Sequence, residues 1–244
     1  MDNQVGQGDR FPTTCASIIL GVRSHDGQRR TRSTEQICLV YWKPVYKYLR
    51  LRWRFNPEET QDITQDFFLK VLERDLFASY DPKKGRFRTF VRVCLDRFVV
   101  DRGRIARALK RGGNMQPLAV DFARAEEELT VDAEVSDPFD VFFDAEWMRH
   151  LLSMSVEKLE TECSSKGKNL HYRIFARFYL HPPGGAPSYA ELATEFAVSV
   201  TEITNRLGFA RREFRRVVLD SLRAISATEE EFRSEARALL GDTG

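Results

Sequence analysis

Apolar residues recur every three to four positions along most of this chain, which is the spacing of amphipathic helices. The clearest stripe is Ile63, Phe67 and Val71. It follows Asn56 and Pro57, a favourable helix start because asparagine accepts amide hydrogen bonds and proline suits the first turn. The pattern predicts an all-α fold.

A second amphipathic helix is predicted after the turn-rich segment that contains Asp81, Pro82 and Gly85. Its buried side is predicted to hold Phe87, Phe90, Val91, Cys94, Leu95, Phe98 and Val99. Basic residues dominate from there onward, namely Arg92, Arg97, Arg102, Arg104, Arg107, Lys110 and Arg111, against Asp96 and Asp101. Such an excess of positive charge suits a phosphate backbone.

The charge changes sign after Gly112 and Gly113. Residues 114–140 contain eight carboxylates and one basic residue, Arg124, which predicts an extended acidic linker over residues 114–137. The whole chain has a formal net charge of only +2, although 30% of its residues are charged. Any nucleic-acid signal therefore lies in how the charge is distributed.

The rest of the chain divides into an arm and two helical domains. Residues 1–33 are rich in Gly, Gln, Ser, Thr and Arg and predict a mobile arm. Its apolar run at residues 16–22 is too short to cross a bilayer and lacks a cleavage site, so we expect a cytoplasmic protein. Residues 34–113 form the first domain, where Pro44 predicts a kink or break because it lacks an amide donor. Residues 138–241 form the second domain.

Two capping boxes predict a helix-turn-helix in the second domain. Ser188 precedes Glu191 by three positions, and Ser199 precedes Glu202 by three, so each serine and glutamate can satisfy the other's free amide. The second helix is then the recognition helix. Its candidate contacts to bases and phosphates are Ser199, Thr201, Thr204, Asn205, Arg206, Arg211 and Arg212. The alternative is a solvated arginine face on an exposed helix.

The reactive residue types form no catalytic or metal-binding pattern. The cysteines contain no CxxC pair and the four histidines complete no zinc spacing. No phosphate loop or nucleophile elbow is present in the sequence. Asp62 and Asp66 are four positions apart on one helix but lack further ligands. We expect a protein that is not an enzyme and uses no metal and no cofactor.

Several segments together resemble the sigma-70 family of bacterial RNA polymerase sigma factors, and most closely its extracytoplasmic-function (ECF) group. The runs DITQDFF (Asp62 to Phe68) and GRFRTF (Gly85 to Phe90), with the basic helix, resemble region 2. The helix-turn-helix resembles region 4, and the whole resemblance extends from about residue 35 to residue 240. One departure is Ala197, which stands in a turn where family members usually carry glycine. A left-handed backbone there costs alanine about 1 kcal/mol.

The resemblance implies a region 2-like helical bundle and a region 4-like helix-turn-helix, joined by the acidic linker. It implies binding to core RNA polymerase and promoter recognition, with region 2 at the minus-ten element and region 4 at the minus-35 element. Region 4 is expected on the flap of the beta subunit, and the linker toward the RNA exit path. An anti-sigma protein is a further partner that the resemblance allows, and no membrane insertion is expected.

Individual roles carry over to matching positions. The residues expected to grip the coiled coil of the beta-prime subunit are Asp62, Gln65 and Asp66. The expected DNA contacts of region 2 are Tyr80, Phe87, Arg97, Val100, Arg104, Arg107, Lys110 and Arg111.

Alternatives stay open for both the residues and the whole chain. Tyr80 and Phe87 either stack on unpaired bases or belong to the core. The chain is either a sigma factor, a free-standing helix-turn-helix regulator that binds duplex DNA alone, or a scaffold that binds polymerase without recognising DNA.

Overall fold

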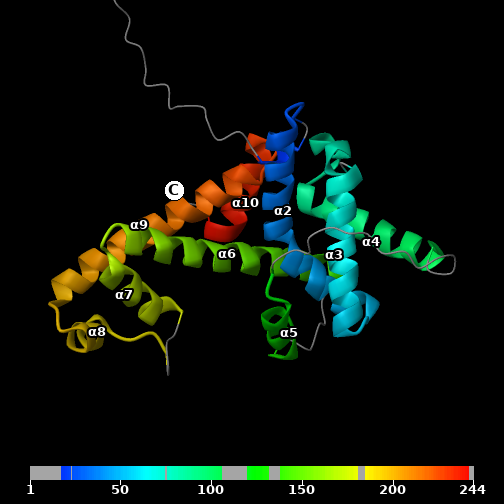
Figure 1. Ribbon diagram of the computed structural model, residues 1–244. Helices are drawn as coiled ribbons and strands as arrows, with labels where there is room; N and C mark the ends of the chain where they lie inside the picture. Colours follow the sequence, from blue (N-terminus) through cyan, green and yellow to red (C-terminus); the bar gives the residue numbers. More distant parts are fainter. Residues whose placement is uncertain are drawn as a thin grey trace, which may run out of the picture.

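The computed structural model describes residues 18–22, 24–74, 76–105, 120–131, 138–180 and 185–241 (Figure 1). Within these ranges the regular structure is entirely helical, which confirms the predicted all-α class. The longer helices are α2 (Gly27–Tyr48), α3 (Pro57–Arg74), α4 (Phe87–Ile105), α5 (Phe122–Val131), α6 (Phe139–Ser165), α7 (Asn169–Tyr179), α8 (Tyr189–Phe196), α9 (Val200–Ala224) and α10 (Glu229–Leu240). The short elements are α1 (Ile18–Gly21), η1 (Leu49–Trp53), η2 (Leu76–Ser79) and η3 (Pro82–Lys84). In this part of the chain no helix is long and apolar enough to cross a membrane.

Helix α2 is the centre of the larger core. Its buried Tyr41 packs edge to face on Phe87 of α4, and its buried Tyr48 packs in the same way on Phe143 of α6. The helix continues through Pro44 to Tyr48, so the predicted break is wrong. A π-helical turn, η1, follows it, and the left-handed Arg54 ends the segment.

The predicted arm is shorter than residues 1–33. Asp26 caps α2 by accepting hydrogen bonds from the amides of Gln28 and Arg29, so the helix already begins at Gly27. Ile19 and Val22 are buried against the core, which anchors residues upstream of that helix. Residues 1–17 of the predicted arm lie outside the described residues.

The acidic linker is also more structured than predicted. Its middle forms α5, which buries Phe122, Ala125 and Leu129 in the larger core. These three residues recur at helical spacing, and the carboxylates between them pair with basic side chains of α2 and η1. The extended tether is therefore wrong for residues 122–131, while residues 114–119 and 132–137 lie outside the described part.

A smaller core holds the helix-turn-helix. It is built from Leu159, Cys163, Ile174, Phe175, Leu192, Ile203, Leu207 and Ala210. Helices α6 and α9 contribute to both cores, because their other halves place Leu151 and Leu222 in the larger one. The packing consequently joins the two regions through α6 and α9, with no separation at the linker.

Candidate polymerase and nucleic-acid interfaces

Helix α3 presents the predicted polymerase-binding residues on its outer face. Its start is fixed by Asn56, whose side-chain oxygen accepts a hydrogen bond from the Glu59 amide at 2.8 Å. The helix buries Ile63 and its apolar neighbours, which turns Asp62 and Asp66 to solvent and leaves Gln65 half-buried.

One carboxylate of this patch already has a basic partner. Both Asp62 and Asp66 are exposed, and Asp66 forms an ion pair with Arg102 of α4. The pair contacts solvent on both sides, so it is expected to stabilise the fold by less than about 1 kcal/mol and to exchange readily for another cation. The structure thus brings the three predicted residues together on a rigid helix.

The second half of α4 carries an accessible surface. Arg97 is exposed. Val100 is 45% exposed, which is unusual for a large apolar residue. Together with Asp96 and Asp101 they line a shallow groove of about 380 Å³. The backbone of Arg104 lies in the last turn of α4. The predicted contacts Arg107, Lys110 and Arg111 lie outside the described residues.

Tyr80 and Phe87 do not belong to this surface. They are 3% and 1% exposed, and their ring centroids are 4.9 Å apart in an edge-to-face contact. The Tyr80 hydroxyl donates to the Gly85 carbonyl oxygen at 2.8 Å, and Phe77 covers Phe87 from another side. The prediction that they stack on DNA bases is wrong for this conformation, because the two rings hold η2 and the loop against α4. The core alternative is correct.

The helix-turn-helix has the predicted caps. The Ser188 side chain accepts from the Glu191 amide, and Glu191 accepts from the Ser188 amide at 2.7 Å. Ser199 and Glu202 repeat this arrangement at the start of α9. Ser199 is therefore occupied as a helix cap, which fixes the start of α9, the predicted recognition helix.

Three exposed positions form the outward stripe of α9, namely Thr201, Asn205 and Arg212. Their spacing of four and seven residues keeps them on one helical face. Gly208 lies in the same stripe, and a Cβ there would meet nothing closer than an Arg212 nitrogen at 3.6 Å. Sequence reasoning did not single out this glycine, although a glycine inside a long helix costs about 1 kcal/mol relative to alanine and leaves the helix backbone uncovered on that face.

The remaining predicted contacts of α9 have partners within the protein. Thr204 donates its hydroxyl to the Val200 carbonyl oxygen at 3.0 Å, and half-buried Arg206 pairs with Glu202 at 2.8 Å. Arg211 donates to the Tyr189 hydroxyl at 3.2 Å and lies 5.4 Å from the centroid of the Tyr179 ring. The predicted positive rod is thus partly neutralised, and Arg212 is the arginine best placed to meet a ligand.

The turn before α9 contains the strain expected at Ala197, which has a left-handed backbone with φ of 53°. We predict that Ala197→Gly raises the free energy of unfolding by up to about 1 kcal/mol, because glycine adopts this conformation without a Cβ clash. Chemical denaturation measures the change. The matched control is Ala190→Gly within α8, which is expected to destabilise by a few tenths to about 1 kcal/mol. Equal destabilisation by both changes would contradict the strain assignment.

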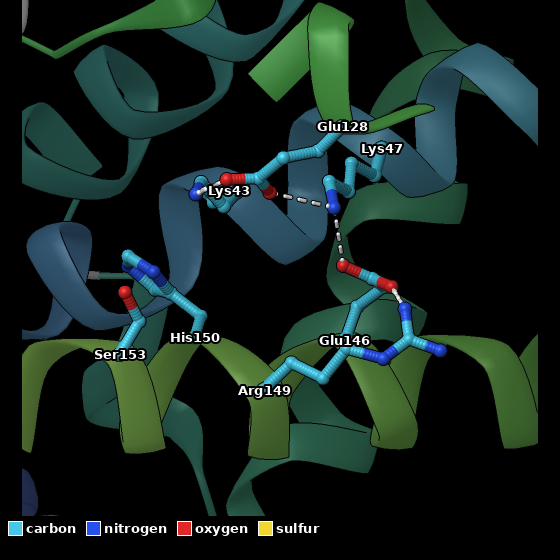
Figure 2. Close-up of a pocket in the computed structure, with 7 residues that line it drawn as sticks. All are labelled: Lys43, Lys47, Glu128, Glu146, Arg149, His150 and Ser153. Atoms are coloured by element: carbon cyan, nitrogen blue, oxygen red, sulfur yellow. Dashed lines mark hydrogen bonds and ion pairs between the residues drawn. The ribbon is translucent and has the colours of Figure 1, made fainter. Parts of the chain in front are cut away.

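Buried charges connect α2, α5 and α6 around a cavity of about 350 Å³ (Figure 2). Figure 2 shows Lys47 between Glu128 and Glu146. Its Nζ lies 2.9 Å from a Glu128 carboxylate oxygen and 2.8 Å from a Glu146 carboxylate oxygen. Glu128 also binds Lys43 at 2.7 Å. Burial raises the pKa of the Glu128 carboxyl, but the hydrogen bonds from both lysines outweigh it and the pKa is lowered. This cluster, together with the pairing of Glu126 and Arg50, holds α5 on α2.

His150 in the same cavity predicts a pH-dependent stability. Its Nε2 donates to the Leu39 carbonyl oxygen at 3.0 Å, and burial lowers its pKa from 6.5 to about 4. As pH falls below 6.5 the unfolded chain takes up this proton first, so the free energy of unfolding should decrease by about 2–3 kcal/mol by pH 4.5.

The measurement is urea unfolding at pH 7 and pH 4.5 for the wild type and for His150→Gln, whose amide can still donate to Leu39. Carboxylates titrate in both proteins, so the contribution of the histidine is the difference between the two proteins in how far the free energy of unfolding falls from pH 7 to pH 4.5. We expect a smaller fall in the variant. An equal fall in both proteins would contradict the assignment.

The described residues contain no group of three histidine, cysteine or acidic side chains arranged to hold a metal ion. Cys38 is buried, and burial raises the pKa of its thiol to about 12, which makes it a packing residue with little thiolate.

Comparison with known proteins adds one finding. The model of the family described as ECF sigma factor matches residues 27–220. No curated protein and no solved structure matches the chain. The matched segment begins at the first residue of α2 and ends within α9, so it leaves α10 outside.

Proposed function

Because the chain belongs to the ECF sigma factor family, whose members bind RNA polymerase and initiate transcription, we propose that it gives core polymerase its promoter specificity. In this proposal region 2 is the α2–α4 bundle and region 4 is the α7–α9 segment with its helix-turn-helix.

The observation that carries the proposal is the acidic face of α3. Two exposed carboxylates on one helix, with the opposite face buried in the core, can meet a basic partner in a single orientation. The proposed partner is the coiled coil of the polymerase beta-prime subunit, and Asp66 would exchange Arg102 for a polymerase cation.

Two surfaces support the promoter contacts. The stripe of Thr201, Asn205 and Arg212 on α9 suits the major groove of the minus-35 element, since hydroxyl and amide groups read base edges and arginine binds phosphate or guanine. Arg97 and Val100 on α4 suit the minus-ten element, where an exposed apolar side chain can contact a base. The beta flap remains the proposed partner of region 4.

The test is transcription in a purified system. Sigma-free core polymerase and the chain are incubated with a library of random promoter sequences, and the transcribed templates are sequenced. We expect enrichment of two sequence blocks separated by a fixed spacer. The proposal is contradicted if adding the chain produces no transcripts above those of core polymerase alone, while another sigma factor shows that the same core polymerase is competent. Tight binding to duplex DNA without polymerase would instead favour a free-standing regulator.

A further inference from the structure

Helix α10 lies beyond the part of the chain that matches the family, yet it packs against the larger core. Thr228 caps it by accepting from the Glu231 amide at 3.1 Å. Its apolar face, Phe232, Ala236, Leu239 and Leu240, packs against the larger core. Figure 1 shows it in red beside α2. The family match therefore assigns no role to α10, although the helix is packed into the fold.

The first contact of α10 is with the start of α4. A Glu231 carboxylate oxygen accepts a hydrogen bond from the backbone amide of Phe87, the first residue of α4, at 3.0 Å. Its other oxygen accepts from the Ala227 amide at 2.8 Å. A carboxylate is favourable at this position because the first amides of a helix lack partners and carry positive partial charge. Helix α4 is therefore capped by a residue 144 positions later in the chain.

The second contact takes up both arginines of the GRFRTF run. Glu235 is 3% exposed and pairs with Arg88 at 2.5 Å and with Arg86 at 3.4 Å. Arg86 also donates to the Ser234 hydroxyl at 3.0 Å. Arg88 has a further partner, Asp144 of α6, at 2.9 Å. Two carboxylates and a hydroxyl of α10 thus occupy the donors at one end of region 2.

The covered donors and the open ones lie on different parts of α4. Arg97 and Val100 remain exposed, so α10 leaves the proposed minus-ten surface accessible. It covers the start of the helix, where backbone amides and arginines together suit the phosphates of a nucleic-acid strand. Helix α10 therefore contacts the donors at the start of α4 and leaves the outward faces of Arg97 and Val100 uncovered.

We propose that α10 is an autoinhibitory helix whose carboxylates occupy Arg86 and the start of α4 in place of the phosphates of an unpaired DNA strand. This rests on the proposed function, because it assigns these donors to the melted promoter. The strand must displace Glu231 and Glu235 before region 2 can hold it, while duplex contacts through α9 proceed with α10 in place. In this proposal the protein binds duplex promoter DNA first, and it binds the unpaired strand only after α10 has been displaced.

The test compares two double variants of the full-length chain that change charge equally on the same helix. Glu231→Gln with Glu235→Gln removes the contacts to α4, and Glu229→Gln with Glu230→Gln is the control, because Glu229 pairs only with exposed arginines and Glu230 is exposed. Affinities are measured by fluorescence anisotropy for a short labelled oligo(dT) strand and for a duplex of the same length at one salt concentration.

We expect the first variant to bind the single strand about tenfold more tightly than the wild type, since one charge-assisted contact is worth roughly that factor. Its affinity for duplex should change less than twofold, and the control should change less than twofold for both probes. Equal changes in the two variants, or no gain for the single strand, overturn the proposal. If the double variant unfolds, Glu231→Gln alone carries the test, because it keeps the Arg88 pair, and about a threefold gain is expected.

Co-elution with core polymerase separates this idea from the proposed function. Wild-type protein that binds core polymerase, with no gain in strand affinity on loss of the α10 carboxylates, refutes autoinhibition and leaves the sigma proposal standing. A gain in strand affinity without any binding to core polymerase refutes the sigma proposal, while it supports competition between the α10 carboxylates and a single strand, which the anisotropy measures without polymerase.

Discussion

Replacing Asp62 and Asp66 together with arginine is expected to lower the affinity for core RNA polymerase by at least about 100-fold, because each reversal places like charges across an interface at a cost of several kcal/mol. Co-elution on a sizing column should be lost. Both side chains are exposed, so the fold should tolerate the change, although an arginine at position 66 will face Arg102. Thermal unfolding of the isolated chain checks that the loss reflects the interface.

The matched control is Glu157→Arg with Glu160→Arg, two exposed carboxylates on α6 with the same change in net charge. It should keep wild-type affinity if the effect belongs to the face of α3. Equal loss in both double variants would mean that overall charge governs the association, and the assignment of α3 as the polymerase-binding helix would then fail.

Arg88→Met is expected to produce the largest loss of stability of any single change described. The side chain is 4% exposed, pairs with two carboxylates and lies 4.9 Å from the centroid of the Trp147 ring. Removing it breaks the buried pair and leaves Glu235 with only the longer contact to the exposed Arg86, and breaking a buried pair costs about 3–5 kcal/mol. For a chain of this size the melting temperature should fall by roughly 10 °C.

Arg86→Met provides the comparison, because Arg86 contacts the same Glu235 from an exposed position, with 44% of its side chain accessible. Its free energy of unfolding should change by less than about 1 kcal/mol. Calorimetry of both variants decides the matter, and similar melting temperatures for the two would show that the buried pair contributes no more than the exposed one.

Local signals identified much of the fold. The helix starts at Asn56, Ser188 and Ser199 were readable because a cap and the amide it binds lie within three residues of each other. The outward position of Asp62 followed from the stripe of apolar residues on the same helix. The left-handed turn at Ala197 was implied by the sigma-factor resemblance, in which glycine usually stands at this place.

Other features depended on partners distant in the chain. The composition of the acidic linker predicts a tether because it does not include Lys43 and Lys47 of α2 and Arg50 of η1, which neutralise the linker carboxylates. Tyr80 and Phe87 had the residue types of a stacking surface, and only the packing of Tyr41 and Phe77 around them made them core.

The sequence by itself therefore determined most of the helices outside the linker, their caps, the family and the outward faces of α3 and α9, because periodicity and capping act over a few residues. Tertiary structure alone decided that α5 docks on α2 and that α10 covers the start of α4. Those choices rest on ion pairs such as Arg50–Glu126 and Arg88–Glu235, whose partners are 76 and 147 positions apart. Whether a charged residue is solvated or paired depends on residues that lie far away in the sequence, and local sequence patterns do not identify those partners.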